Sequence, residues 1–167
     1  YINDFKIEEL GLGDSLLDKY TKEDILDNQL NYYPETQFNS TTFFSKATTF
    51  EYEQIEAGYK KDDKKFIIYA ISGLIFFEND MEKCNIKKEE VVKNLSDVLK
   101  ISEWFHDIST DKYGSYDDKY ILLESGDTVG VTCSDWNKET ELELKWHDNL
   151  RVSINSMEWE VMLLDSD

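Results

Sequence analysis

The chain has 167 residues, of which 40% are apolar, and this length is enough for one domain with a sizeable core. Its formal net charge of −18 repels phosphate groups, so we expect neither nucleic acid nor an anionic membrane as a partner. The longest uncharged stretch, residues 66–77, is shorter than the roughly 20 apolar residues of a membrane span. We therefore predict a single acidic domain, residues 1–167. The charge keeps that domain soluble, and a cationic partner or weakly bound divalent ions are the alternative interpretations.

In the first 60 residues, a helical pattern is followed by two strand patterns. Ser15 or the neighbouring Asp14 can cap a helix, and the apolar spacing behind them predicts one broken helix, or two short ones, over residues 15–28. Residues 41–46 and 48–59 are rich in Thr, Phe and Tyr, which favour pleated, half-buried surfaces. We expect a strand in each of those two ranges.

Residues 66–71 and 74–77 form two apolar runs separated by Ser72 and Gly73. A two-residue Ser-Gly link is typical of a tight hairpin, so we predict two antiparallel strands here. One continuous strand with a bulge at Gly73 is the alternative.

The clearest helical pattern of the chain follows a cap at Asn85, and this helix is expected to end between residues 102 and 104. Its apolar positions have helical spacing, and they are Val91, Val92, Leu95, Val98 and Leu99. A polar loop is predicted over residues 107–118. Four more strands are predicted at about residues 119–124, 128–136, 141–146 and 150–154.

Short turns join successive strands, and this favours antiparallel pairing because parallel strands need a long crossover connection. The predicted fold class is α+β. We expect a largely antiparallel sheet of about six to eight strands with two helical segments packed on it, in the order α-β(3-4)-α-β(4). No Pro-rich or Gly-rich linker divides the chain, whose single proline is Pro34.

The segment GDSLLD at residues 13–18 resembles the first block of the GDSL lipases and esterases. In that family the serine is the nucleophile and a histidine activates it, so the resemblance makes Ser15 a candidate catalytic residue. The family's late Asp-x-x-His block is missing, because neither His106 nor His147 has Asp three positions before it. A helix N-cap explains Ser15 without catalysis, so the esterase is an alternative hypothesis.

The two histidines each precede an aspartate, in the pairs His106-Asp107 and His147-Asp148. Brought together, such pairs supply ligands for a metal or an acid–base couple, although both occur where elements are expected to end. Three further carboxylates are weak candidates for a metal site: Asp111, Asp117 and Asp118. Because they lack the ligand spacing of an EF-hand, weak divalent-cation binding is a second alternative and no cofactor is predicted.

Three of the four tryptophans fall in the last third of the chain, and they are Trp136, Trp146 and Trp159. The core is the favoured position for such large rings. An exposed group of them among acidic residues is the alternative, and it would form a surface that binds a ligand or a partner. These tryptophans are therefore weak candidates for a binding site.

The sequence contains two cysteines, Cys84 and Cys133, and no Cys-x-x-Cys or Cys/His cluster of the kind that binds zinc. Either a disulfide joins them or both are buried thiols of a cytosolic protein, and the composition leaves both interpretations open. The chain begins at Tyr1, which is compatible with a mature form whose signal peptide was removed or with a trimmed chain.

Segments over most of the chain resemble a group of small exported proteins from marine alphaproteobacteria of the SAR11 type. The segments are residues 11–18, 21–25, 68–75, 82–84, 131–136 and 148–154. Members of that group have a cleavable signal peptide and cysteines at the places of Cys84 and Cys133. The resemblance implies a periplasmic or secreted protein with a Cys84–Cys133 disulfide, and it implies no activity.

The leading hypothesis from the sequence is a non-enzymatic periplasmic interaction or ligand-binding module, because no complete catalytic set is present. Its partner is expected to be a protein or a small ligand. The alternatives are an esterase that uses Ser15 and a weak binder of divalent cations.

Overall fold

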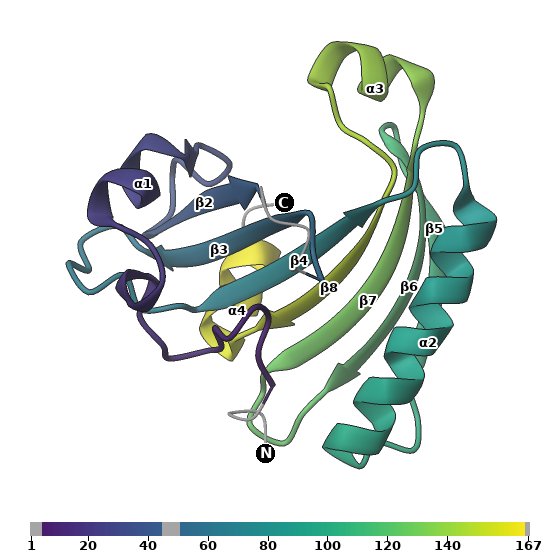
Figure 1. Ribbon diagram of the computed structural model, residues 1–167, viewed down its shortest axis with the longest axis horizontal. Coiled ribbons are helices and arrows are strands. Elements are labelled where there is room, and N and C mark those ends of the chain that lie inside the picture. The colour runs from purple at the N-terminus through teal and green to yellow at the C-terminus, as the bar shows by residue number, and fades with distance from the viewer. Residues whose placement is uncertain (1–4, 45–50, 166–167) are drawn as a thin grey trace. The chain divides into compact units, whose positions relative to one another are not determined.

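The computed structural model describes residues 5–44 and 51–165 (Figure 1). Within these ranges it contains eight strands: β1 (Gln29–Leu30), β2 (Phe38–Phe44), β3 (Gln54–Lys60), β4 (Ala70–Phe76), β5 (Phe105–Thr110), β6 (Gly114–Leu122), β7 (Thr128–Trp136) and β8 (Asn149–Asn155). The same ranges contain four α-helices: α1 (Lys22–Asp27), α2 (Met81–Leu99), α3 (Lys138–Leu144) and α4 (Met157–Asp165).

Hydrogen bonding connects the strands in the order β1-β2-β3-β4-β8-β7-β6-β5. The pairs β1·β2, β2·β3 and β5·β6 are antiparallel. The predicted α+β fold with a largely antiparallel sheet is confirmed. The chain divides into two compact units: the first takes in the described parts of residues 1–73 and 153–167 together with 122–128, and the second takes in residues 74–121 and 129–152.

Helix α1 of the first unit begins at a capping box. The backbone N–H of Asp24 donates to Oγ1 of Thr21 (3.1 Å), and the N–H of Thr21 donates to the Asp24 carboxylate (3.4 Å). Ile25 is fully buried, and its carbonyl accepts a hydrogen bond from the Thr41 hydroxyl on β2 (2.9 Å). The prediction of one broken helix or two short ones is therefore correct in outline, as a 3-10 turn (Leu16–Asp18) followed by α1.

Helix α4 packs on β3 through Trp159, which is 6% exposed. A Cβ atom at Gly58 would lie 2.2 Å from the Trp159 ring, so only glycine allows this close approach of strand and helix. Trp159 forms one hydrophobic core cluster of this unit with Phe38, Ala70 and Met162. Because Gly58 and its neighbour Ala57 point to opposite sides of β3, and Ala57 pairs with Thr41, α1 and α4 cover opposite faces of β2 and β3.

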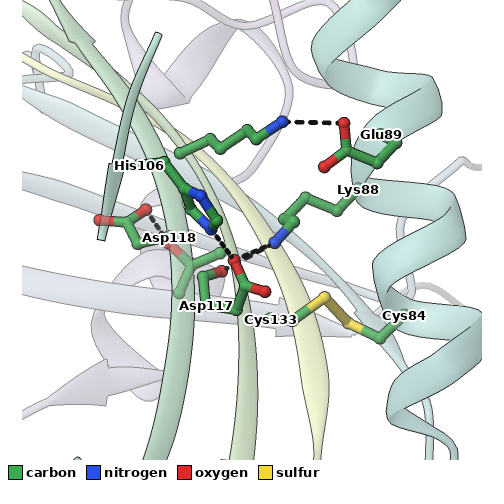
Figure 2. A network of polar contacts seen from close by, with 9 residues as sticks. Cys84, Lys88, Glu89, His106, Asp117, Asp118 and Cys133 are labelled. Carbon is green, nitrogen blue, oxygen red and sulfur yellow. Dashed lines mark hydrogen bonds and ion pairs between the residues drawn. A yellow bond between two sulfur atoms is a disulfide. The ribbon is translucent and has the colours of Figure 1, made fainter. Parts of the chain in front are cut away.

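In the second unit, α2 runs along one face of β6 and β7, as Figure 2 shows at close range. Asp80 caps the helix by accepting a hydrogen bond from the N–H of Lys83 (3.1 Å). The helix ends at Leu99, earlier than predicted, because Lys100 adopts a left-handed conformation with φ 57°. The predicted apolar stripe is buried at Val91, Val92 and Leu95, whereas Val98 is 64% exposed.

The predicted hairpin at Ser72 and Gly73 is wrong, since β4 is one continuous strand across both residues. A Cβ atom at Gly73 would lie 2.4 Å from the ring of Tyr52. Glycine is required there for packing against an aromatic ring, and not for a turn. The strands predicted at residues 41–46 and 48–59 correspond to β2 and β3, and residues 45–50 of those ranges lie outside the described residues.

The predicted polar loop at residues 107–118 is replaced by most of β5, a turn and the start of β6. All six residues of β5 are exposed. A strand with no buried face needs no alternation of apolar and polar residues, which is the pattern by which strands are predicted. The strand predicted at residues 141–146 is also wrong, because this segment lies in α3 and the turn that follows. Its alternating leucines are exposed and do not mark a sheet face. None of the helices in the described ranges has the length and apolar character needed to cross a membrane.

Candidate functional site

Two of the three tryptophans singled out in the sequence meet in the second unit. The rings of Trp136, at the end of β7, and Trp146, after α3, have centroids 4.7 Å apart and planes tilted by 60°. Tyr116 contacts Trp136 edge-on at 5.5 Å, and Tyr113 lies 5.8 Å from Trp146. All four rings are at least partly exposed. Trp159, in contrast, is buried in the core of the first unit.

Hydrogen bonds hold both the backbone and the ring of Trp136. Its indole Nε1 donates to the carbonyl of His147 (3.1 Å), and its backbone N–H donates to the Asp148 carboxylate (2.8 Å). Asp148 is only 2% exposed, and its second carboxylate oxygen accepts from the N–H of Asn79 (3.2 Å). The polar groups of this part of the chain are satisfied internally, so the partly exposed ring of Trp136 is fixed in place.

The turn between β5 and β6 is organised by Asp111. Its Oδ1 accepts hydrogen bonds from the N–H groups of Tyr113 (2.7 Å) and Gly114 (3.1 Å) and from the hydroxyl of Tyr116 (3.0 Å). Partial loss of water raises the pKa of Asp111, but these hydrogen bonds lower it more, so the pKa lies below its ordinary value. Burial and the Asp111 charge raise the pKa of the Tyr116 phenol to about 12.

Helix α3 is attached to the same turn. The side-chain oxygen Oδ1 of Asn137 caps the helix by accepting from the N–H of Thr140 (2.9 Å), while its side-chain nitrogen Nδ2 donates to the carbonyl of Lys112 (2.7 Å). The Thr140 hydroxyl donates to the carbonyl of Tyr113 (2.9 Å). One capping residue therefore joins the start of α3 to the β5–β6 turn.

Gly114 allows the turn and the end of β7 to lie this close together. A Cβ atom at this position would be 2.3 Å from the carbonyl oxygen of Asp135. The backbone N–H of Asn137 also donates to the carbonyl of Tyr113 (2.9 Å) across the same contact. Any larger residue at position 114 would push the turn that carries Tyr113 away from the end of β7 that carries Trp136.

Two leucines of α3, the helix attached to the turn of the aromatic cluster, are also exposed. Leu142 is 70% exposed and Leu144 is 45% exposed, which is unusual for leucines on one short helix. We refer to these exposed or partly exposed residues of the aromatic cluster and α3 together as the α3-end patch: Tyr113, Trp136, Leu142, Leu144 and Trp146. Figure 1 shows α3 beyond the ends of the strands to which it is attached.

The segment that carries most of the α3-end patch is acidic. Residues 135–145 contain four acidic side chains and two basic ones. Burial, reinforced by the charge of Asp148, raises the pKa of Asp135. One cation is already in contact with the aromatic cluster, because Nζ of Lys112 lies 4.7 Å from the centre of the Tyr113 ring.

A second polar cluster fastens α2 to the sheet, and Figure 2 shows its members. A disulfide joins Cys84 on α2 to Cys133 on β7. Lys88, one turn further along α2 and 2% exposed, forms an ion pair with Asp117 on β6. Nε2 of His106 lies 2.8 Å from the same carboxylate. Partial loss of water raises the pKa of Asp117, but the bonds to Lys88 and His106 lower it more, so the net shift is downward.

The three carboxylates considered as metal ligands have separate roles. Asp117 faces α2, whereas Asp118 accepts a hydrogen bond from the Thr132 hydroxyl (2.6 Å) on the opposite face of the strand. Asp111 is occupied by the donors of its own turn. Among residues 5–44 and 51–165, no group of three or more His, Cys, Asp or Glu side chains is placed to hold a metal ion.

Ser15, the candidate nucleophile, caps the 3-10 turn that follows it. Its hydroxyl donates to the carbonyl of Lys65 (2.5 Å) and accepts from the N–H of Leu17 (3.1 Å). The imidazole of His147 lies 3.1 Å from a Glu78 carboxylate oxygen, with Nδ1 as the contacting atom. Neither histidine pairs with the aspartate that follows it in the sequence: the partner of His106 is Asp117, and that of His147 is Glu78.

A scan against protein-family models, a search of curated proteins and a search of solved structures each give no significant match to this chain. The site is therefore defined by its own geometry. Sequence reasoning singled out Trp136 and Trp146 but missed Leu142 and Leu144, which it assigned to a strand. It also missed Lys88, which no local pattern distinguishes from the adjacent Lys87.

Proposed function

We propose that the protein is an exported, non-enzymatic interaction module that binds a basic, partly apolar segment of another protein through the α3-end patch. The observation that carries this proposal is the combination of exposed leucines with partly exposed Trp and Tyr rings on a hydrogen-bonded support. Trp and Tyr are the residues that most often dominate binding energy at protein interfaces. A support that is already ordered also reduces the entropy lost on binding.

The arrangement of the rings favours a polypeptide over a flat ligand. The planes of Trp136 and Trp146 are tilted by 60°, and Tyr116 meets Trp136 at 80°. These rings form no flat platform of the kind that stacks on one face of a sugar or a base. They instead offer several small apolar contacts in different directions, and Leu142, 70% exposed on the attached helix α3, supplies another.

Charge supports a basic partner. The protein has 36 acidic and 18 basic side chains, and the acidic excess persists at residues 135–145, which include Trp136, Leu142 and Leu144 of the patch. A basic segment would be attracted to this surface from a distance and would neutralise part of its charge on contact. An acidic segment would be repelled by the same groups.

The disulfide supports export to an oxidising compartment. Cys84 and Cys133 are joined in the structure, and such bonds persist in the periplasm and outside cells but are rare in the cytosol. This inference agrees with the resemblance to small exported proteins.

The contacts of Ser15 favour a binding module over an esterase. Its hydroxyl proton is directed to the carbonyl of Lys65, and its oxygen accepts from the N–H of Leu17. A serine nucleophile needs a general base at its hydroxyl, and here a main-chain carbonyl occupies that position.

The proposal can be tested with three short synthetic peptides and NMR of the labelled protein. In the first peptide Lys alternates with Leu, in the second Glu alternates with Leu, and in the third Lys alternates with Ser. We expect saturable shifts at Tyr113, Trp136 and Trp146 with the first peptide only, because binding needs both positive charge and apolar contact.

A substitution in α3 supplies the matched test. Leu142→Gln is expected to weaken binding of the Lys-Leu peptide about fivefold, since it removes an exposed apolar contact without touching the core. Leu164→Gln is the control, because Leu164 is a leucine on α4 with 76% exposure. Equal binding of the Glu-Leu peptide, or an unchanged affinity in Leu142→Gln, would contradict the proposal.

A further inference from the structure

The first unit contains a cavity of about 630 Å³ between α4 and the segment that precedes β2. This volume is within the range of small-molecule sites. Its lining residues are Tyr32, Tyr33, Pro34, Glu35, Thr36, Gln37, Glu158, Val161, Met162 and Asp165. We propose that this cavity binds a small organic cation with a single ammonium group, independently of the α3-end patch in the second unit.

Aromatic rings form one side of the cavity. Tyr33 packs edge-on against Trp159, with ring centroids 5.3 Å apart, and Tyr32 packs edge-on against Tyr33 at 6.3 Å. Tyr32, which lines the cavity, is 51% exposed. The faces of such rings attract cations, and the attraction strengthens as the cation loses water.

Three carboxylates line the cavity: Glu35, Glu158 and Asp165. Glu158 forms an ion pair with Lys60, whose Nζ lies 2.7 Å from Oε2 of Glu158. In the part of the chain that the structure describes, no cation pairs with Glu35 or Asp165. These two carboxylates would repel a carboxylate or phosphate ligand and would attract a positively charged one.

Two lysines of the protein show how ammonium groups are bound near this cavity. Nζ of Lys60 is held between the Glu158 carboxylate and the ring of Tyr69, whose centre is 4.7 Å away. Nζ of Lys61 donates to the carbonyl of Pro34 (2.9 Å) on the cavity wall. A carboxylate and an aromatic ring around one ammonium group are the same elements that Glu35 and Tyr32 offer inside the cavity.

The apolar part of the lining defines the ligand further. Val161 and Met162 of α4 supply no hydrogen-bond donor or strong acceptor, so the part of a ligand that lies against them should be apolar. An alkylated ammonium group combines a positive charge with apolar surface. We therefore expect the cavity to prefer a quaternary or primary alkylammonium compound to a sugar, an amino-acid zwitterion or an anion.

The decisive comparison uses choline and its neutral isostere 3,3-dimethylbutan-1-ol, in which carbon replaces the nitrogen. Binding is followed by NMR of the full chain, with the indole N–H of Trp159 as a reporter beside Tyr33. We expect choline to give saturable shifts there and to bind at least about fivefold more tightly than the neutral alcohol. Added salt should weaken choline binding and leave the alcohol unaffected.

Paired variants separate charge from shape. Glu35→Gln combined with Asp165→Asn is expected to weaken choline binding about threefold to tenfold and to leave binding of the neutral alcohol unchanged. Asp27→Asn is the control, because Asp27 is an exposed carboxylate of the same unit outside the cavity. Thermal unfolding of each variant verifies that the unit remains folded.

Several results would overturn the inference. They are equal affinity for choline and the alcohol, no shift at Trp159 up to about 50 mM choline, shifts confined to the second unit, and an unchanged choline affinity in the double variant. Leu142→Gln must leave choline binding unchanged. Failure of the peptide experiments and failure of the choline experiment are therefore distinguishable.

Discussion

The ammonium of Lys88, on α2, lies against the carboxylate of Asp117, on β6, although only 2% of Lys88 is exposed. The pair is one helical turn from the disulfide at Cys84, so two kinds of bond fasten the same stretch of helix to the sheet (Figure 2). Asp117 also contacts His106 and keeps 29% of its side chain exposed. The charge of Lys88 therefore depends more on Asp117 than the charge of Asp117 depends on Lys88.

This asymmetry predicts unequal effects of removing either charge. Asp117→Asn leaves the buried ammonium of Lys88 without its carboxylate and is expected to lower the free energy of unfolding by about 3 to 5 kcal/mol. Lys88→Met leaves a carboxylate that is partly hydrated and bound to His106, so a smaller loss of about 2 kcal/mol is expected. Urea unfolding of both single variants and the double variant measures the difference. A double variant whose loss equals the sum of the single losses would show that the pair is not coupled.

The disulfide is predicted to contribute through the unfolded state. It closes a loop with a sequence separation of 49, for which chain entropy gives a stabilisation of about 4 kcal/mol. We expect the Cys84→Ala, Cys133→Ala double variant to lose about that free energy of unfolding while keeping its fold. Reduction of the unsubstituted protein should give the same loss. A difference below about 1 kcal/mol would contradict the chain-entropy explanation.

Strand β7 was predicted with its observed bounds, because apolar alternation and turn residues mark residues 128–136. Strand β5 was missed because all its residues are exposed, and an exposed strand is held by backbone hydrogen bonds that leave no apolar pattern. Leu142 and Leu144 alternate as a strand would, yet Asn137 caps a helix there. The helix cap and the alternating leucines favour different structures, and the tertiary contacts that decide between them cannot be read from the sequence.

The contacts of the candidate site could not be predicted either, because they also join residues that are distant in the sequence. Trp136 and Trp146 were recognised as large aromatic residues, but their meeting depends on the path of α3 between them. The burial of Lys88 depends on a partner 29 positions away, at Asp117. No local rule relates two such distant positions, so the sequence predicts the kind of residue and not its partner.

Asp118 is predicted to destabilise the folded protein at neutral pH. Burial, only partly offset by the hydrogen bond from Thr132, raises its pKa, and the charge of Asp107 opposite it on β5 adds to the rise. Because the folded-state pKa lies above the ordinary value, folding binds protons between the two values. Stability therefore falls as the pH rises through that window, and the deficit persists at higher pH.

Asp118→Asn should remove that deficit. We expect a gain of about 0.5 to 1 kcal/mol at pH 7 that disappears below the ordinary pKa of aspartate, because Asn keeps an acceptor for the Thr132 hydroxyl. Asp107→Asn, which removes only the opposing charge, should give a smaller gain. Chemical unfolding between pH 3 and pH 7 measures both. A loss of stability in Asp118→Asn across this range would show that its charge is favourable.

Gly58 is predicted to be required by the ring of Trp159. A Cβ atom at position 58 would overlap the ring at 2.2 Å, so Gly58→Ala must displace α4 from β3 and should lower the free energy of unfolding by about 2 kcal/mol. Trp159→Leu removes the obstructing ring at the cost of a cavity. In the double variant, the added cost of Gly58→Ala should fall below about 0.5 kcal/mol, because no ring remains to be displaced. An undiminished cost in that background would trace the requirement for glycine to the conformation of β3 and not to the packing of α4.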